Sequence, residues 1–250
     1  MEHVTLLGFV GLFVLSFLVS LYATIAGGAA LVFIPLFTLM GIPILPAIAH
    51  VRVVSVFLQL VSILAFQRKK VIDWKVSIWS SLWTLPASFL GAFLTLRMSD
   101  EVLRYLAAAF MAAALLVVLK INLKDLKKRP VNPYFYVLIA IGSFLLGIYG
   151  GLYGAAFSTL LMLLYIRLGG ENVITASANA SVVTLVMSVV VSYAYIRSGL
   201  ISWGFIIPLV AGGILGTVIA VELAVEKGSA WIKVVLATVI LLSLVKLLFA

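Results

Sequence analysis

The sequence predicts an all-α polytopic membrane protein made of two homologous repeats. Hydrophobic residues account for 65% of the 250 positions and charged residues for only 10%, proportions that exclude a soluble globular chain. Apolar stretches recur along the chain, and most are close to the ~20 residues that a helix needs to cross a hydrocarbon core. A backbone surrounded by lipid must satisfy its own hydrogen bonds, so each stretch should be a helix.

The repeat is marked by two loops that each close with a tryptophan. Val-Ile-Asp-Trp occupies residues 71–74 and Leu-Ile-Ser-Trp occupies residues 200–203, so the two tryptophans are 129 positions apart. A similar order of long and short apolar stretches surrounds both loops, a pattern typical of secondary transporters. We therefore predict an N-terminal transmembrane repeat over 1–120, a basic cytoplasmic linker over 121–132 and a C-terminal transmembrane repeat over 133–250.

Each repeat should contain about five apolar segments. The second segment is short in both repeats, and it either spans the membrane or re-enters it on the side where the first began. The expected segments are about 4–26, 28–41, 44–67, 74–97 and 101–120, followed by 133–152, 154–168, 172–196, 203–223 and 229–249.

Basic residues and the length of the first apolar stretch set the expected topology. Lys and Arg concentrate in 68–75 and 120–129, two loops separated by two crossings, so both should be cytoplasmic. The stretch 4–40 lacks the features of a cleavable signal peptide. As one helix it would be about 55 Å long, too long for a core of about 30 Å. We expect Gly27-Gly28 to break it and to send the chain back, which makes the repeats inverted. One bent crossing would instead give eight helices and parallel repeats.

The residue that points most directly to function is Arg52, near the middle of the 44–67 segment. A central arginine is costly in lipid unless it faces a cavity or a partner, and all eight acidic residues lie at predicted segment ends or in loops. An unpaired guanidinium is a natural partner for an oxyanion. Alternatively, Arg52 snorkels or bonds to helix-terminal carbonyls and only holds the fold together.

Polar side chains on two equivalent segments extend this candidate site. They are His50, Ser55 and Gln59 in the first repeat and Asn179, Ser181 and Thr184 in the second. The offset of 129 pairs Arg52 with Ser181 and His50 with Asn179, so the two polar stripes could line a shared pocket. His50 could donate to an anion or take up a proton. A purely structural histidine, and hydroxyls that bond to their own helix backbone, are the competing interpretation.

Glycine-rich breaks precede both short segments. Gly27-Gly28 stands before one and Gly154-Ala155 before the other, so each short helix begins where the backbone can approach a ligand. Free N–H groups and the positive end of the helix dipole favour an anion there. Small residues in membrane helices also permit close helix packing, which is the alternative role.

These motifs resemble the TauE/SafE family of sulfite-exporter-like membrane permeases over nearly the whole chain. The resemblance rests on the glycine break followed by Pro35, Gly-Ile-Pro at 41–43, Ala-Ile-Ala at 47–49 before Arg52 and the loop at 71–74, with 154–156, Gly169 and 176–179 as their counterparts. The family commonly has Thr-Asn-Lys or Thr-Asn-Arg where this chain has His-Val-Arg at 50–52, so only the basic residue matches. The resemblance implies transport of sulfur-containing anions such as sulfite or small organosulfonates.

We therefore expect a multi-pass protein of the cell membrane that acts as a secondary carrier for such an anion, bound near the midplane between the repeats. The alternative is an anion channel, or a carrier of another small organic anion such as a carboxylate. We expect no enzyme activity and no cofactor or metal, since no Ser-His, paired-Asp or metal-ligand set falls within the segments. The net charge of +9 indicates contact with membrane lipids rather than nucleic acid. Proton coupling and homo-oligomer formation stay open.

Overall fold

The computed structural model describes residues 6–109 and 131–227, and all regular elements in these two ranges are α-helices. The linker predicted at 121–132 and the predicted segment 229–249 fall largely outside the described residues, as does the second half of the segment at 101–120. Residues 100–109 are helical. The remaining helices are α1 (Leu6–Ala26), α2 (Ala30–Leu39), α3 (Ile44–Arg68), α4 (Trp74–Thr95), α6 (Phe135–Leu152), α7 (Phe157–Gly169), α8 (Val173–Arg197) and α9 (Trp203–Lys227).

Six of these helices, α1, α3, α4, α6, α8 and α9, are long and apolar enough to cross a membrane. The helices α2 and α7 are shorter, with 10 and 13 residues, and neither reaches the length of a full crossing. The protein is thus an all-α integral membrane protein with several spans, as the sequence predicted.

Local sequence explains where the helices break and begin. Gly27 and Gly28 have φ angles of 75° and 83°, a left-handed conformation that glycine adopts without a steric cost, so α1 ends there. Asp73 caps α4, because its carboxylate accepts from the backbone N–H groups of Lys75 and Val76. Asn172 caps α8 by accepting from the N–H of Thr175 at 2.9 Å. Such caps satisfy N–H groups that lack a partner within the helix.

The helices α6 and α7 form a hairpin that returns to its starting end. The N–H of Asn132, just before α6, donates to the carbonyl of Leu168 in the last turn of α7 at 3.0 Å. Since α7 is too short for a crossing, the hairpin enters the protein and turns back at Gly154. The second short segment is therefore re-entrant in shape.

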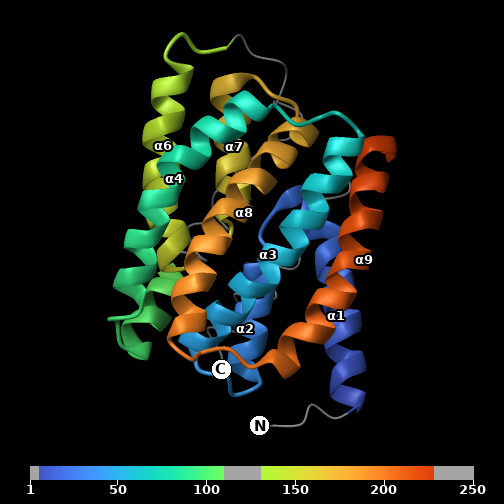
Figure 1. Ribbon diagram of the computed structural model, residues 1–250, viewed down its shortest axis with the longest axis vertical. Helices are drawn as coiled ribbons and strands as arrows, with labels where there is room; N and C mark the ends of the chain where they lie inside the picture. The colour runs from blue at the N-terminus through green and yellow to red at the C-terminus, as the bar shows by residue number, and fades with distance from the viewer. Residues whose placement is uncertain (1–5, 110–130, 228–250) are drawn as a thin grey trace.

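The helices α1 and α2 make the corresponding hairpin from the opposite end. Glycines 212 and 216 of α9 pack against Phe13 and Phe17 of α1, so α1 and α9 run in the same direction. Phe37, near the end of α2, stacks edge-on against His50, whose ring also meets Phe205 near the start of α9. The chain thus returns to the end where α1 begins, and Figure 1 shows α1 and α6 starting at opposite ends of the molecule.

The two repeats exchange helices around a central pair. In Figure 1, α1 of the first repeat lies beside α9 of the second, α6 of the second lies beside α4 of the first, and α3 and α8 cross between them. Both outer pairs pack through small residues: Gly91 and Gly151 touch each other's backbones in one, and Gly212 approaches the backbone of Phe13 in the other. Close backbone approach through glycine is a usual way for membrane helices to associate.

Candidate functional site

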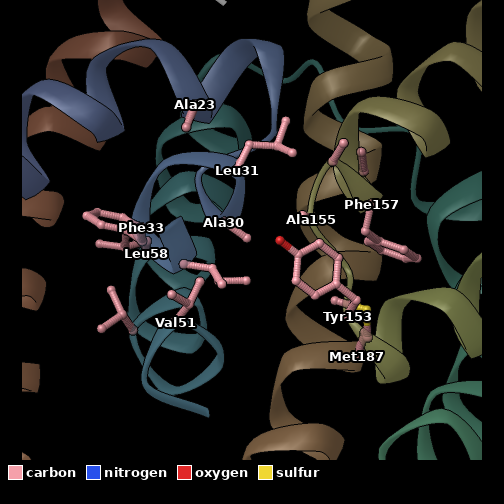
Figure 2. Packing of buried hydrophobic residues seen from close by; sticks show 14 of the residues in the cluster. Ala23, Ala30, Leu31, Phe33, Val51, Leu58, Tyr153, Ala155, Phe157 and Met187 are labelled. Carbon is pink, nitrogen blue, oxygen red and sulfur yellow. The ribbon is translucent and has the colours of Figure 1, made fainter. Parts of the chain in front are cut away.

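A small polar cavity lies where the two hairpins meet between α3 and α8. Its volume available to the centres of water-sized molecules is about 40 Å³, enough for roughly three waters. Figure 2 shows the two broken segments facing each other, with Ala30 on one side and Tyr153 and Ala155 on the other. The lining residues are Ala23, Gly28, Ala29, Ala30, Arg52, Ser55, Gln59, Gly154, Ala156, Phe157, Ser158 and Thr184.

Six residues of the predicted site line this cavity although they are distant in sequence. They are Gly28, Arg52, Ser55, Gln59, Gly154 and Thr184. The offset of 129 relates Gly28 to Phe157, Ala29 to Ser158 and Ser55 to Thr184, and both members of each pair line the cavity. Equivalent residues of the two repeats therefore line the cavity. The interface between repeats is where transporters built from them hold their substrate.

Arg52 supplies the positive charge of the cavity. Its side chain is 3% exposed, and its Nη2 donates to the carbonyl oxygens of Gly150 at 3.0 Å and Tyr153 at 2.8 Å, at the end of α6. No carboxylate pairs with Arg52 anywhere in residues 6–109 or 131–227. The guanidinium therefore holds the end of α6 and also lines the cavity with its charge uncompensated by an acid.

Unpaired backbone N–H groups surround the same space. The amides of Gly28, Ala29 and Ala30 precede the first hydrogen-bonded turn of α2, and those of Ala156 and Ser158 lie at the start of α7. Within the described residues none of these five amides donates a hydrogen bond, and all five residues line the cavity. Two helix N-termini with free N–H groups thus converge on one small space, an arrangement that favours an anion.

Glycine is required at both breaks because the chains approach too closely for a side chain. Gly154 has a φ of 64°, and a Cβ there would overlap the guanidinium of Arg52. Gly27 has a φ of 75°, and its Cβ would lie 2.5 Å from Oγ of Ser158 and 2.7 Å from the backbone nitrogen of Thr159. Gly27 does not line the cavity itself, but it lets the first hairpin contact the start of α7.

The remaining polar side chains differ in what they can offer a ligand. Gln59 is half-buried and has no hydrogen-bond partner within the described residues, so its amide N–H groups are free to donate. Ser55 and Thr184 instead donate to their own helices, at Val51 and Ala180, which is the local bonding common for hydroxyls in helices. They present lone pairs to the cavity unless the hydroxyls rotate.

Four other residues of the predicted site lie away from the cavity. His50 sits near one end of the protein and Asn179 near the other, and each binds a loop. Ser181 bonds to Ser62 across α3 and α8 and to the carbonyl of Ser177. Ala155 is fully buried, and its carbonyl accepts from the hydroxyl of Tyr149.

Several lining residues were not among those predicted from sequence. Ser158 is the clearest, since it belongs to the same small-residue break as Gly154 and its polar side chain marks the first turn of α7. Its repeat equivalent, Ala29, carried no polar signal. Two larger grooves exist elsewhere, but they are apolar and lie along α4 and α6 around Trp79, where Ile78, Ile141 and other exposed apolar side chains suit contact with lipid.

This chain is similar to one protein family and to several membrane transporter proteins. The pattern of one family, described as sulfite exporter TauE/SafE, matches residues 12–247. The chain belongs to the TauE/SafE family. Its relatives include the probable membrane transporter protein ORF9 from Sinorhizobium sp, a probable membrane transporter protein from Haemophilus influenzae and the probable membrane transporter protein YfcA from Escherichia coli K12.

The similarity to these relatives extends over most of each chain. The identity is 27% over 239 residues for the Sinorhizobium protein, covering 95% of this chain and 91% of the relative. It is 27% over 226 residues for the Haemophilus protein, covering 89% and 87%, and 25% over 241 residues for YfcA, covering 95% and 88%. No solved structure matches the chain. This TauE/SafE protein is a membrane transporter.

Proposed function

We propose that this transporter is a secondary carrier for a small sulfur-containing oxyanion such as sulfite or a small organosulfonate. The anion binds in the cavity between the two hairpins, near the middle of the membrane. The observation that carries the proposal is the convergence of the buried Arg52 with five unpaired backbone N–H groups from two helix N-termini. The family's description as sulfite exporters supports sulfur chemistry for the cargo.

Each part of the cavity has a distinct role in this proposal. Arg52 supplies a full positive charge that no acid in the described residues neutralises, so an anion is favoured over a cation or a neutral solute. The N–H groups of α2 and α7 match oxyanion acceptors, which bind well at helix N-termini. Gln59, which follows Arg52 in α3, adds the neutral N–H groups of its amide as donors. The small volume of about 40 Å³ favours a compact inorganic oxyanion over an extended organic one.

The experiment measures anion binding by the purified transporter. Calorimetry and thermal shifts are recorded with sulfite, thiosulfate, sulfoacetate, isethionate and taurine, because a ligand that binds the native state raises its apparent stability. Arg52→Ala should weaken binding of the best ligand by about 100-fold or more, since charge-assisted hydrogen bonds are lost. Normal sulfite and sulfonate affinity in a folded Arg52→Ala protein overturns the site.

A second variant separates anion binding from support of the α6 end. Arg52 bonds to Gly150 and Tyr153, so Arg52→Ala lowers stability whatever the ligand does. Gln59→Ala touches no hydrogen bond of the described residues and should leave the melting temperature nearly unchanged while weakening binding about 5- to 10-fold. His50→Gln, outside the cavity, is the control and should bind normally. Unchanged binding in Gln59→Ala argues that the ligand lies elsewhere.

Transport assays distinguish a carrier from a channel. In proteoliposomes loaded with the anion found by the binding screen, a carrier shows uptake of labelled anion stimulated by unlabelled anion on the other side. A conductance proportional to the anion gradient, without such exchange, would make the protein an anion channel.

A further inference from the structure

A second polar cluster, remote from the cavity, joins the two repeats at the end where the basic loop 68–70 lies. Asn179 of α8 is fully buried. Its Oδ1 accepts from the N–H of Asp73 at 2.8 Å and from Oγ of Ser77 at 3.1 Å. Its Nδ2 donates to both carboxylate oxygens of Glu171 at 3.1 and 3.0 Å. Asn179 thus tethers the start of α4, in the first repeat, to α8 in the second.

The hydrogen bonds of Asn179 fix the orientation of its amide, and Glu171 accepts from the NH₂ group. The N–H of Asp73 can only donate, so the oxygen of the Asn179 amide must face it and the NH₂ group must face Glu171. An ionised carboxylate accepts at both oxygens and suits this arrangement. A protonated carboxyl has one oxygen that carries a proton, so it cannot accept from Asn179 in the same way. The geometry of the tether therefore depends on the ionisation of Glu171.

The surroundings of Glu171 make that ionisation sensitive near neutral pH. Glu171 lies in the loop between α7 and α8, outside the membrane-spanning segments. Burial raises its pKa from 4.5 to about 7, the hydrogen bond from Asn179 opposes this, and the negative charge of Asp73 adds to it. The groups that act on it are Asn179 from α8, Asp73 from the loop before α4 and Tyr165 from α7. No cation pairs with it in the described part of the chain.

The opposite end of the protein carries an equivalent tether, which indicates that the contact is a repeated device. His50 occupies the position of Asn179 in the first repeat, and Ser202 occupies that of Asp73 in the second. The N–H of Ser202 donates to Nε2 of His50 at 2.9 Å, while Nδ1 of His50 donates to the carbonyl of Pro46 at 2.6 Å. Each loop before a tryptophan is thus held by the central helix of the other repeat.

We propose that Glu171 is a proton-binding site of the transporter, and that taking up a proton there releases the α4 start from α8 and opens this end of the protein. This rests on the proposed carrier function, because opening one end while the other stays tethered is what alternating access requires. The proton then becomes a coupled ion, and a pH difference across the membrane biases which end opens. Each pH unit changes the ratio of protonated to ionised Glu171 tenfold.

The test measures the opening directly and needs no transported anion. The chain has no cysteine, so Lys75→Cys and Arg167→Cys can carry a pair of spin labels at exposed positions, in the first turn of α4 and at the end of α7 that leads into α8. Pulsed electron paramagnetic resonance in lipid nanodiscs follows the label distance between pH 5.5 and 8.5. We expect a longer distance to appear on acidification, with a midpoint near pH 7. A distance distribution that is the same at both pH values overturns the proposal.

Variants assign the titration to Glu171. Glu171→Gln mimics the protonated state and should hold the longer distance at every pH. Glu222→Gln removes an exposed carboxylate from the Lys69 ion pair at the same end and should titrate like the unmodified protein. If Glu171→Gln does not fold, Glu171→Asp keeps a carboxyl at an altered position and should displace the midpoint. Unaltered titration in either Glu171 variant overturns the assignment.

The outcomes also separate this inference from the proposed cargo. If the pH response is absent while sulfite or an organosulfonate still binds, the proposed proton site is wrong and the proposed carrier function stands. If the pH response is present while none of the tested anions binds, the proposed cargo is wrong and the proposed proton site stands.

Discussion

His50 and Asn179 make the same contact at opposite ends of the protein. They are 129 positions apart, and each accepts a backbone N–H from the loop before a tryptophan of the other repeat, from Ser202 at 2.9 Å and from Asp73 at 2.8 Å. The central cavity lies between these two contacts. The two contacts thus hold one loop at each end of the protein.

The first prediction concerns the tether at His50. His50→Ala removes the acceptor for Ser202 and a buried ring that packs between Phe37 and Phe205. We expect a loss of about 2–4 kcal/mol, from the cavity and from the lost hydrogen bonds. In His50→Gln the amide oxygen can reach the position of Nε2. This variant should therefore lose about 1 kcal/mol less stability than His50→Ala, which is the value of one hydrogen bond. Thermal unfolding in detergent measures both, and equal losses would argue that packing alone matters at this position.

The second prediction concerns the glycine that contacts Arg52. Gly154→Ala places a methyl group against the guanidinium and forces a left-handed φ of 64° on alanine. We expect a loss of about 3–5 kcal/mol, the sum of strain and overpacking, together with loss of anion binding. Gly199→Ala is the matched control, since its φ is 71° and nothing lies within 4 Å of the added Cβ. That variant should lose only ~1–2 kcal/mol from strain. Similar melting temperatures for the two variants contradict the proposed close contact.

The third prediction concerns the packing of α1 on α9. Gly212→Ala would push a methyl group into the backbone of Phe13, so the helices must separate at a cost of about 1–3 kcal/mol. Gly11→Ala, on α1 with open space around the added Cβ, should be neutral or slightly stabilising because alanine favours a helix over glycine. Thermal unfolding of both variants checks the difference, and an unaffected Gly212→Ala would show that the two helices do not approach this closely.

The fourth prediction concerns the pH dependence of stability. Because the pKa of Glu171 is raised from 4.5 to about 7 in the folded protein, the folded state holds this proton more tightly than the unfolded state does. The contribution of Glu171 to stability is therefore full below pH 4.5, falls as the pH rises to about 7 and is constant above it. Glu171→Gln should remove this decline and melt at a higher temperature than the unmodified protein at pH 8. Glu222→Gln should keep the decline. A decline that persists in Glu171→Gln must come from other groups.

Hydropathy, charge and glycine placement were enough to predict most of the fold. The all-α class and the long spans follow from the length of the apolar stretches. The helix ends also carry local signals: Asp73 caps α4 and the φ angles at Gly27 and Gly28 end α1. Sequence left the role of the short segments open. Whether a short apolar helix crosses or turns back depends on contacts such as that of Asn132 with Leu168, which no local pattern encodes.

The candidate site was predictable only where a residue is costly or geometrically special. Arg52 is predictable because an arginine in the middle of a membrane segment is costly unless it faces a cavity or a partner. Gly28 and Gly154 are predictable because glycine breaks a helix. Ser158 and Ala29 were missed, since an ordinary small residue gives no signal until its neighbours in space are known. His50 lies two positions before Arg52, and Asn179 lies two positions before Ser181, the repeat equivalent of Arg52. The turn of the helix nevertheless directs both side chains to the loops.

The amino-acid sequence alone is enough to predict an all-α membrane protein with a repeated segment order, two glycine breaks and one unmatched arginine. Hydrophobic transfer and backbone hydrogen bonding act locally, so they can be read along the chain. Three features become visible only in the folded protein: the two breaks face one cavity, Arg52 also binds the end of α6, and Glu171 lies against Asn179 and Asp73. Those contacts join residues from different repeats, and their geometry follows from how α3, α8 and the two hairpins pack together.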